Sequence, residues 1–160
     1  MNKTIVVSGG FDPIHVGHIR MIKEASQYGD VIVVANSDDW LVRKKGFLFM
    51  PFEQRAEILS EIKGVIRVES VDDSDNTVCK ALEYIKPSYF ANGGDRGKSN
   101  TPEQTVCEAL GIELLWAIGG EYKANSSSNL TNRLLRVHPE NKSKEQIDFE
   151  EENTYTYHLP

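Results

Sequence analysis

The chain has 160 residues, of which 39% are hydrophobic and 26% charged, and its formal net charge at pH 7 is -6. A chain of this length and apolar content can bury one core without a disulfide or a metal staple, so we expect a single domain. The negative charge argues against broad binding to nucleic acid or to an anionic membrane, because such partners require a dominant basic surface.

β-branched runs alternate with segments of helical apolar period along the chain. Strands are expected at Thr4 to Val7, Val31 to Ala35, Arg67 to Val71, Tyr89 to Ala91 and Glu113 to Ala117. Helices are expected at Val16 to Tyr28, Pro51 to Ile62, Asn76 to Ile85, Pro102 to Leu110 and Leu130 to Val137. This alternation predicts an α/β fold: one doubly wound, Rossmann-like domain with a five-stranded parallel sheet and helices on both faces.

Local signals predict the ends of two helices. Gly29 is placed to end the first expected helix. The clearest signal is Thr101-Pro102-Glu103-Gln104, in which a threonine cap, a proline at the first helical position and a glutamine three residues after the cap form a capping box. Gly111 is expected to close that helix.

The two cysteines, the absence of a recognisable targeting segment and the composition of the last residues give three further expectations. Cys79 and Cys107 lie in helix-like segments without a Cys-x-x-Cys pair, which indicates buried thiols in a reducing compartment. We recognise no signal peptide and no apolar stretch long enough to cross a bilayer, so we expect a cytoplasmic protein. One folded domain over residues 1–137 and a polar, acidic extension over 138–160 are expected, the extension being either solvated or folded onto a neighbouring subunit.

The opening of the chain carries the strongest functional pattern. The run Thr4 to Val7 leads into Ser8-Gly9-Gly10-Phe11-Asp12-Pro13-Ile14-His15-Val16-Gly17-His18. The paired glycines allow the backbone to turn sharply beside an anion, and the N–H groups of the helix that follows would face the same anion. His15 and His18 add compact donors, suited to negative charge that builds on a phosphorus centre under attack.

Gly10 to His18 resembles the HxGH signature of the nucleotidyltransferase superfamily, whose members join a nucleoside triphosphate to a phosphorylated acceptor and release pyrophosphate. Further motifs follow in the order of the sugar-phosphate branch, which includes heptose 1-phosphate adenylyltransferases and glycerol-3-phosphate cytidylyltransferases. These motifs are Asn36-Ser37-Asp38, Arg43-Lys44-Lys45-Gly46, Glu53-Gln54-Arg55, Asn92-Gly93-Gly94-Asp95 and Ser126-Ser127-Ser128.

The resemblance implies a role for each motif. The expected catalytic residues are His15 and His18, which would contact phosphate oxygens, and Lys44 or Lys45, which would neutralise charge from a loop that Gly46 frees. The expected nucleotide-binding residues are Gly9, Gly10, Phe11, Asn92, Gly94, Asp95, Ser126, Ser127 and Ser128.

Three more residues are expected at phosphate or at the acceptor: Asp12, Arg55 and Arg133. Asp12 is expected to fix the turn rather than to act on phosphate. The planar fork of Arg55 suits a bidentate phosphate contact, with a salt bridge to Glu57, Glu61 or another surface acid as the structural alternative.

The motifs together predict an enzyme that transfers a nucleoside monophosphate to a sugar or polyol phosphate, with ATP slightly favoured over CTP as the donor. The alternatives are a cytidylyltransferase for a polyol or alcohol phosphate and a catalytically silent nucleotide-binding module. Mg²⁺ is expected to arrive on the nucleotide phosphates, and no protein metal ligand is expected. The habit of the family is consistent with a homodimer.

Overall fold

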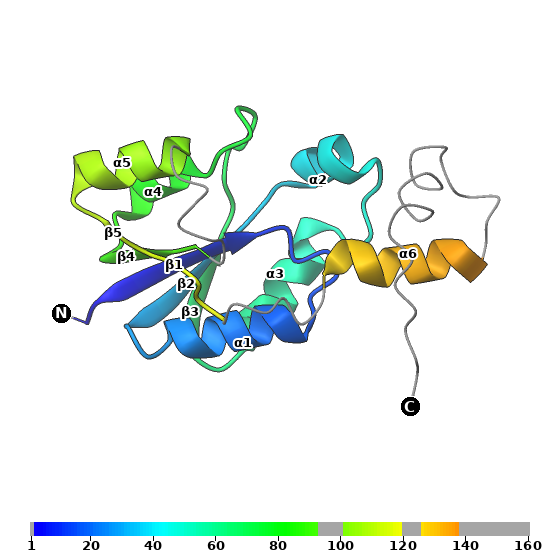
Figure 1. The fold of residues 1–160 in the computed structure, drawn as a ribbon, viewed down its shortest axis with the longest axis horizontal. Coiled ribbons are helices and arrows are strands. Elements are labelled where there is room, and N and C mark those ends of the chain that lie inside the picture. Colours follow the sequence, from blue (N-terminus) through cyan, green and yellow to red (C-terminus); the bar gives the residue numbers. More distant parts are fainter. Residues whose placement is uncertain (1, 93–100, 120–125, 138–160) are drawn as a thin grey trace. The chain divides into compact units, whose positions relative to one another are not determined.

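The computed structural model describes residues 2–92, 101–119 and 126–137. The chain divides into two compact units, Met1–Ser127 and Ser128–Pro160. The first unit contains the sheet and the helices that cover it (Figure 1). The predicted extension over 138–160 lies outside the described residues.

The first unit is built on a five-stranded parallel sheet with the strand order β3-β2-β1-β4-β5. The central strands β1 and β2 pair from Thr4 with Asp30 to Gly9 with Ala35. The predicted doubly wound α/β fold is therefore confirmed. The strands are β1 (Thr4–Gly9), β2 (Asp30–Ala35), β3 (Val65–Glu69), β4 (Tyr89–Ala91) and β5 (Glu113–Leu115).

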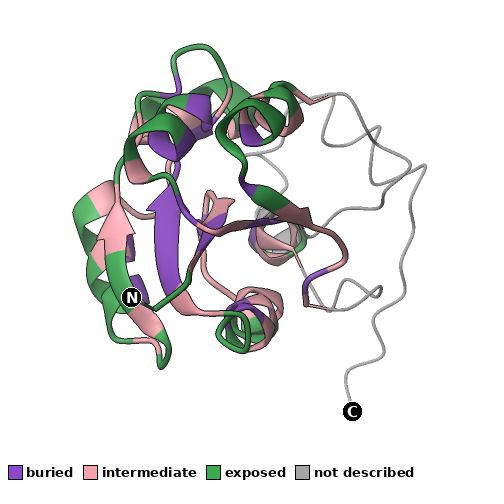
Figure 2. Ribbon diagram, turned by 90° about the vertical axis from the view of Figure 1, so that its left-hand side faces the viewer, coloured by how far each residue is buried: buried purple, intermediate pink, exposed green. Residues whose placement is uncertain are grey.

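Helices cover both faces of this sheet, as Figure 1 shows. α1 and α3 pack on the face that receives Ile5, Val7 and Val33, and α4 and α5 pack on the face that receives Val6 and Ile32. Successive side chains of β1 thus enter opposite cores, which explains the continuous apolar run of this strand. Figure 2 colours the ribbon by burial and shows buried strand segments inside the molecule. The helices are α1 (Val16–Ala25), α2 (Asp38–Lys45), α3 (Phe52–Ser60), α4 (Cys79–Ile85), α5 (Pro102–Leu110) and α6 (Ser127–Val137).

The third strand begins earlier than predicted, at Val65 instead of Arg67. Its register is set by β2: Val31 pairs with Val65, and the Val31 N–H donates to the carbonyl oxygen of Gly64 at 3.1 Å. A shift in register follows between Val31 and Ile32. Pairing with the neighbouring strand therefore overrides the local apolar pattern on which the prediction depended.

The helix ends test two of the glycine predictions. The Thr101 hydroxyl accepts a hydrogen bond from the Gln104 N–H at 3.3 Å, and Gly111 closes α5 in the left-handed region, as predicted. The prediction for Gly29 is wrong, because α1 ends at Ala25 with Ser26 as its C-cap. Gly29 is needed for a different reason: a Cβ at this position would collide with the main-chain carbonyl of Lys3.

Helix α2 lies where a loop was expected, which is a further correction. Ser37 caps its start by accepting from the Trp40 N–H at 3.0 Å, and Asp38 and Asp39 occupy its first turn. Arg43, Lys44 and Lys45 form its last turn, and Gly46 ends it with φ 84°. The acidic residues at the start and the basic residues at the end complement the helix dipole. The serine cap and the glycine beyond the last turn are typical of helix ends. The signals for this helix were therefore present in the sequence.

The strand order fixes where a ligand would bind. After β1 the chain builds β2 and β3 on one side and then crosses to build β4 and β5 on the other. The carboxyl ends of β1 and β4 therefore flank a topological switch point, where ligands of open α/β sheets bind. The Gly9–Gly10 turn follows β1 at this edge.

Candidate active site

His15 and His18 lie at the N-terminal end of α1, directly beyond the turn that follows β1. The two side chains cap the helix reciprocally: the Gly17 N–H donates to His15 Nδ1 at 3.0 Å, and the His15 N–H donates to His18 Nδ1 at 3.1 Å. Their rings stack with centroids 3.8 Å apart and an interplanar angle of 27°. Because each Nδ1 accepts a main-chain hydrogen bond, Nε2 is the ring nitrogen through which each histidine can donate. The pair thus places two imidazole Nε2 atoms at one helix N-terminus.

Asp12 holds the turn before these histidines. Its carboxylate is fully buried and accepts from the main-chain N–H groups of Phe49 and Met50 at 2.9 and 2.6 Å. The carbonyl oxygen of Asp12 accepts from Lys45 Nζ at 2.8 Å. The residue therefore ties the turn to α2 and to the segment before α3, which agrees with a turn-fixing role.

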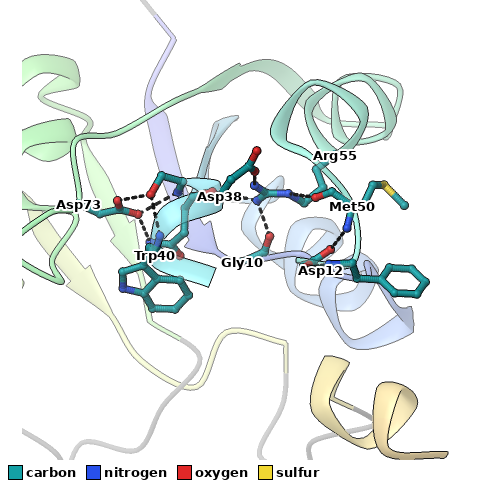
Figure 3. Close-up of polar contacts among 10 residues, drawn as sticks. Gly10, Asp12, Asp38, Trp40, Met50, Arg55 and Asp73 are labelled. Atoms are coloured by element: carbon teal, nitrogen blue, oxygen red, sulfur yellow. Dashed lines mark hydrogen bonds and ion pairs between the residues drawn. The ribbon is translucent and has the colours of Figure 1, made fainter. Parts of the chain in front are cut away.

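Arg55 lies differently from the expectation of a direct phosphate contact. Its side chain is fully buried, and the guanidinium donates to the carbonyl oxygens of Gly10 at 2.8 Å, Asn36 at 2.9 Å and Met50 at 2.9 Å (Figure 3). Nη2 pairs with the Asp38 carboxylate at 2.6 Å. The structural alternative, a salt bridge to an acid of the surface, is thus observed with Asp38, whose side chain is 37% exposed, and not with Glu57 or Glu61. The structure therefore makes Arg55 a residue that positions the backbone of the glycine turn.

The two candidate lysines have different surroundings. Lys45 reaches the turn through Asp12, and burial is the main cause that lowers the pKa of its ammonium group, with the nearby Asp12 acting in the opposite direction. Lys44 is exposed, and its Nζ lies 4.6 Å from the ring centroid of Trp40. Of the two, Lys45 is the one that contacts the histidine-bearing turn.

The serine cluster is tied to the same turn by its second member. The Ser127 hydroxyl donates to the carbonyl oxygen of Pro13 at 2.6 Å, and Pro13 lies two residues before His15 in the chain. Ser126 and Ser127 belong to the first unit, whereas Ser128 and Arg133 belong to the second. Within that unit the Thr131 hydroxyl donates to the Ser128 carbonyl at 3.1 Å.

The remaining expected nucleotide-binding residues follow β4. The Asn92 N–H donates to Leu115 of β5 at 2.7 Å, and the Asn92 carbonyl accepts from Ile118 at 3.4 Å. Asn92 therefore joins the carboxyl ends of the two strands beside the switch point. Gly94 and Asp95 lie outside the described residues.

Asp73 is a buried residue of this edge that the sequence analysis missed. Its carboxylate accepts from Asn36 Nδ2 at 3.0 Å, from the Ser37 N–H at 2.9 Å and from the Ser37 hydroxyl at 2.6 Å (Figure 3). These bonds fasten the segment after β3 to the end of β2 and the start of α2. The signal was the acidic pair Asp72-Asp73 directly after a strand, opposite the Asn-Ser motif at the end of its neighbour.

Two general features concern metals and membranes. Within residues 2–92, 101–119 and 126–137, no group of three or more His, Cys, Asp or Glu side chains is arranged to hold a metal ion. In the same part of the chain, no helix combines the length and the apolar character needed to span a bilayer.

A family model described as cytidylyltransferase-like matches residues 6–133. The chain belongs to the cytidylyltransferase-like family. The match begins within β1 and contains the histidine pair and the serine cluster. The predicted family is therefore confirmed, and the residues that carry the site lie inside the region that defines it.

Relatives of this cytidylyltransferase-like chain include larger proteins. Bifunctional protein HldE of Geobacter metallireducens is 31% identical over 143 residues, which cover 86% of this chain and 28% of that protein. FAD synthase of Ferroglobus placidus is 37% identical over 94 residues, which cover 59% of this chain and 60% of that protein. The matches thus span less than two thirds of the length of either relative.

Solved structures share the fold of this cytidylyltransferase-like chain. The lipopolysaccharide core biosynthesis protein of Thermoplasma volcanium matches with a TM-score of 0.59 and 27% identity, over 72% of this chain and 94% of that one. A protein of unknown function from Archaeoglobus fulgidus matches with a TM-score of 0.56 and 18% identity, over 78% of this chain and 96% of that one. The second likeness shows the fold alone.

Proposed function

We propose that this protein transfers a nucleoside monophosphate from a nucleoside triphosphate, with ATP favoured, to a sugar or polyol phosphate and releases pyrophosphate. The observation that carries the proposal is the stacked pair of His15 and His18, with ring centroids 3.8 Å apart. Both rings use Nδ1 to cap α1 and so direct their donor capacity to Nε2. This pair follows β1 at the edge of the sheet where ligands of this fold bind.

The proposed reaction is one in-line displacement. A phosphate oxygen of the acceptor attacks the α-phosphorus, the bond from that phosphorus to the bridging oxygen breaks, and the electron pair leaves with pyrophosphate. The acceptor is already an anion, so no general base is required, and catalysis depends on alignment and on stabilising charge. The Nε2–H groups of His15 and His18 donate to the phosphate oxygens on which this charge grows.

Other residues of the chain support these donors. Gly9, Gly10 and Phe11 present main-chain N–H groups to the nucleotide, Arg55 fixes the Gly10 carbonyl, and Lys45 adds positive charge beside Asp12. Ser127 joins the start of α6 to the same turn. Mg²⁺ enters as part of the substrate, bound through the triphosphate, and offsets its negative charge.

Different observations support the identity of the nucleotide donor and that of the acceptor. FAD synthase, by its name, makes a dinucleotide that contains an adenylyl group, and the basic and Gly-Gly-Asp motifs resemble those of heptose 1-phosphate adenylyltransferases, so ATP is favoured over CTP. The identity of 37% to FAD synthase over 94 residues also supports a second candidate acceptor, flavin mononucleotide.

Pyrophosphate release provides the test. The protein is mixed with Mg²⁺ and either ATP or CTP, together with a heptose 1-phosphate, a hexose 1-phosphate, glycerol 3-phosphate or flavin mononucleotide, and the nucleotide product is identified by mass. We expect release of pyrophosphate that depends on the acceptor and is fastest with ATP and a sugar phosphate. Tight nucleotide binding without release in any combination would instead support the silent binding module.

A further inference from the structure

Asn36 is the residue through which the end of β2 holds the glycine turn that follows β1. Its main-chain N–H donates to the carbonyl oxygen of Gly9 at 2.9 Å, which extends the pairing of β1 and β2 beyond Ala35. Its own carbonyl oxygen accepts from Nη1 of Arg55 at 2.9 Å, and the same nitrogen donates to the carbonyl oxygen of Gly10 at 2.8 Å. The carbonyl groups of both glycines are therefore fixed by donors from β2 and α3.

These two carbonyl groups determine where the next main-chain N–H groups point. The Gly9–Gly10 and Gly10–Phe11 peptides are trans, and the C=O and N–H bonds of a planar trans peptide point in opposite directions. The Gly10 N–H is therefore directed away from Asn36, toward the side of β1 on which β4 lies. The Phe11 N–H is likewise directed away from Arg55. The Gly10 N–H thus faces the switch point between β1 and β4, where ligands of open α/β sheets bind.

Asp73 holds Asn36 from the segment that follows β3, the outer neighbour of β2. Its carboxylate accepts from Nδ2 of Asn36 at 3.0 Å and from the N–H and the hydroxyl of Ser37 at 2.9 and 2.6 Å. Figure 3 shows this carboxylate beside the start of α2. Asp73 is itself held in place, because its carbonyl oxygen accepts from Nη2 of Arg43 at 2.9 Å and from the Asn76 N–H at 2.8 Å.

The connection from Asp73 to the glycine turn is buried along its length. Asp73 is 2% exposed, Asn36 5% and Arg55 1%. Among the described residues, no lysine or arginine forms an ion pair with the Asp73 carboxylate, which is stabilised there by three hydrogen-bond donors. Groups so far from solvent cannot exchange a lost partner for bulk water, so a change at Asp73 shifts Asn36 itself.

We propose that Asp73 is a positioning residue for the transfer reaction, and that through Asn36 it sets the direction of the Gly10 N–H that faces the nucleotide phosphates. This inference rests on the proposed function and adds to it a residue that acts through another. The Asp73 carboxylate holds Asn36, and the Asn36 N–H holds the Gly9 carbonyl. The N–H of that same peptide is then preorganised to donate to a phosphate oxygen. A residue that only stabilises the fold would leave the kinetics of folded molecules unchanged.

Removal and exchange of the two side chains test the connection. Asp73→Ala leaves Asn36 without its acceptor, and we expect kcat/KM for the nucleotide to fall about tenfold, since a misdirected donor costs less than a deleted one. Asn36→Asp sets two carboxylates against each other and is expected to cause a similar loss. Adding Asp73→Asn to Asn36→Asp restores one carboxylate opposite one amide, and we expect kcat/KM to return to within about threefold of the parent.

A matched control and a binding readout separate positioning from general damage. Asp75→Ala removes an exposed carboxylate of the same segment that accepts from Thr77, and it is expected to leave kcat/KM unchanged. In every variant we expect KM for the acceptor to stay within about twofold. Calorimetric titration with inorganic pyrophosphate and Mg²⁺ requires no turnover, and Asp73→Ala is expected to weaken binding about tenfold. Circular dichroism and urea unfolding give the folded fraction to which each rate is referred.

Each result decides the inference. Loss in Asp73→Ala and recovery in the double variant support it. Parent-like kinetics and pyrophosphate binding in folded Asp73→Ala overturn it and leave the proposed function standing. If Asp73→Ala does not fold, the exchange decides alone, and a double variant no better than Asn36→Asp overturns the inference, as does a parent that binds no pyrophosphate. Absence of pyrophosphate release from every mixture counts against the proposed function, while the titrations still decide whether Asp73 positions the turn.

Discussion

The two ring nitrogens of each histidine in the α1 cap serve different purposes. Nδ1 of His15 and Nδ1 of His18 accept main-chain N–H groups and close the first turn of the helix. Nε2 is then the nitrogen that carries a proton and can donate to a ligand. A capping role and a phosphate-binding role are therefore compatible in the same side chain.

Substitution of His18 separates these two roles. His18→Gln keeps an acceptor at the third helical position, so we expect the free energy of unfolding to stay within about 0.5 kcal/mol of the parent. His18→Ala removes the acceptor and is expected to cost about 1 kcal/mol. Both changes remove the imidazole ring and its N–H group, so we expect kcat to fall at least about 100-fold in each.

Urea unfolding and pyrophosphate release measure the two effects. Retention of parent-like turnover by His18→Gln would show that His18 only caps the helix and would remove it from the proposed mechanism.

Removal of Arg55 tests the buried network. Arg55→Met leaves the carbonyl oxygens of Gly10, Asn36 and Met50 without their donor and the Asp38 carboxylate without its cation. We expect a loss of about 3 kcal/mol or more in the free energy of unfolding. Arg67→Met is the matched control, because Arg67 is half-exposed and pairs with Glu69 at the surface, where a loss of less than about 1 kcal/mol is expected. Equal losses in the two variants, measured by urea unfolding, would contradict the positioning role.

At the scale of elements, α2 shows what sequence patterns can and cannot settle. Its ends could be predicted from the sequence, since Ser37, Asp38 and Gly46 occupy the helix-end positions that such residues favour. The resemblance to a family with a basic loop led instead to a loop prediction. The contacts of α2 could not be predicted from the sequence, because Leu41 and Trp40 approach Gly10 only when β1 and β2 are paired side by side.

Two glycines test how an element tolerates a side chain. Gly111 has φ 71° and open space around its Cβ position, so Gly111→Ala is expected to cost only the left-handed strain, about 1 kcal/mol. Gly29→Ala would push a Cβ into the main-chain carbonyl of Lys3 at the start of β1, which cannot move without disturbing the sheet. We therefore expect the larger loss of stability in Gly29→Ala, measured as a lower thermal midpoint. A smaller effect there than in Gly111→Ala would contradict this packing.

At the scale of the whole molecule, the alternation of strands and helices predicted the fold class. The order β3-β2-β1-β4-β5 was not predictable from this alternation, because another doubly wound order has the same succession of elements. Likewise, the meeting of Ser127 with Pro13 depends on which strands are neighbours. The histidine motif was readable, whereas the buried Arg55 and Asp73 needed the long-range contacts of the fold.

The pH dependence of stability reports on the core between α4, α5 and the sheet. Burial raises the pKa of the Cys107 thiol to about 11, compared with 9.0 for the free group. The folded state therefore holds this proton more tightly than the unfolded state, and its contribution to stability is full below pH 9.0 and is lost as the pH rises toward 11. We expect the loss of unfolding free energy over this window to be smaller in Cys107→Ala. An identical alkaline profile in that variant would contradict the assignment.

Transfer of a labelled phosphorus is the most direct test of the central claim. The parent protein and His18→Gln are each incubated with Mg²⁺, a sugar phosphate and ATP that carries a label on its α-phosphorus. The account predicts that the parent moves the label into a nucleotide-sugar product while pyrophosphate leaves unlabelled, and that His18→Gln forms this product at least about 100-fold more slowly. Label that stays in ATP, ADP or AMP, or equal transfer by both proteins, would contradict it.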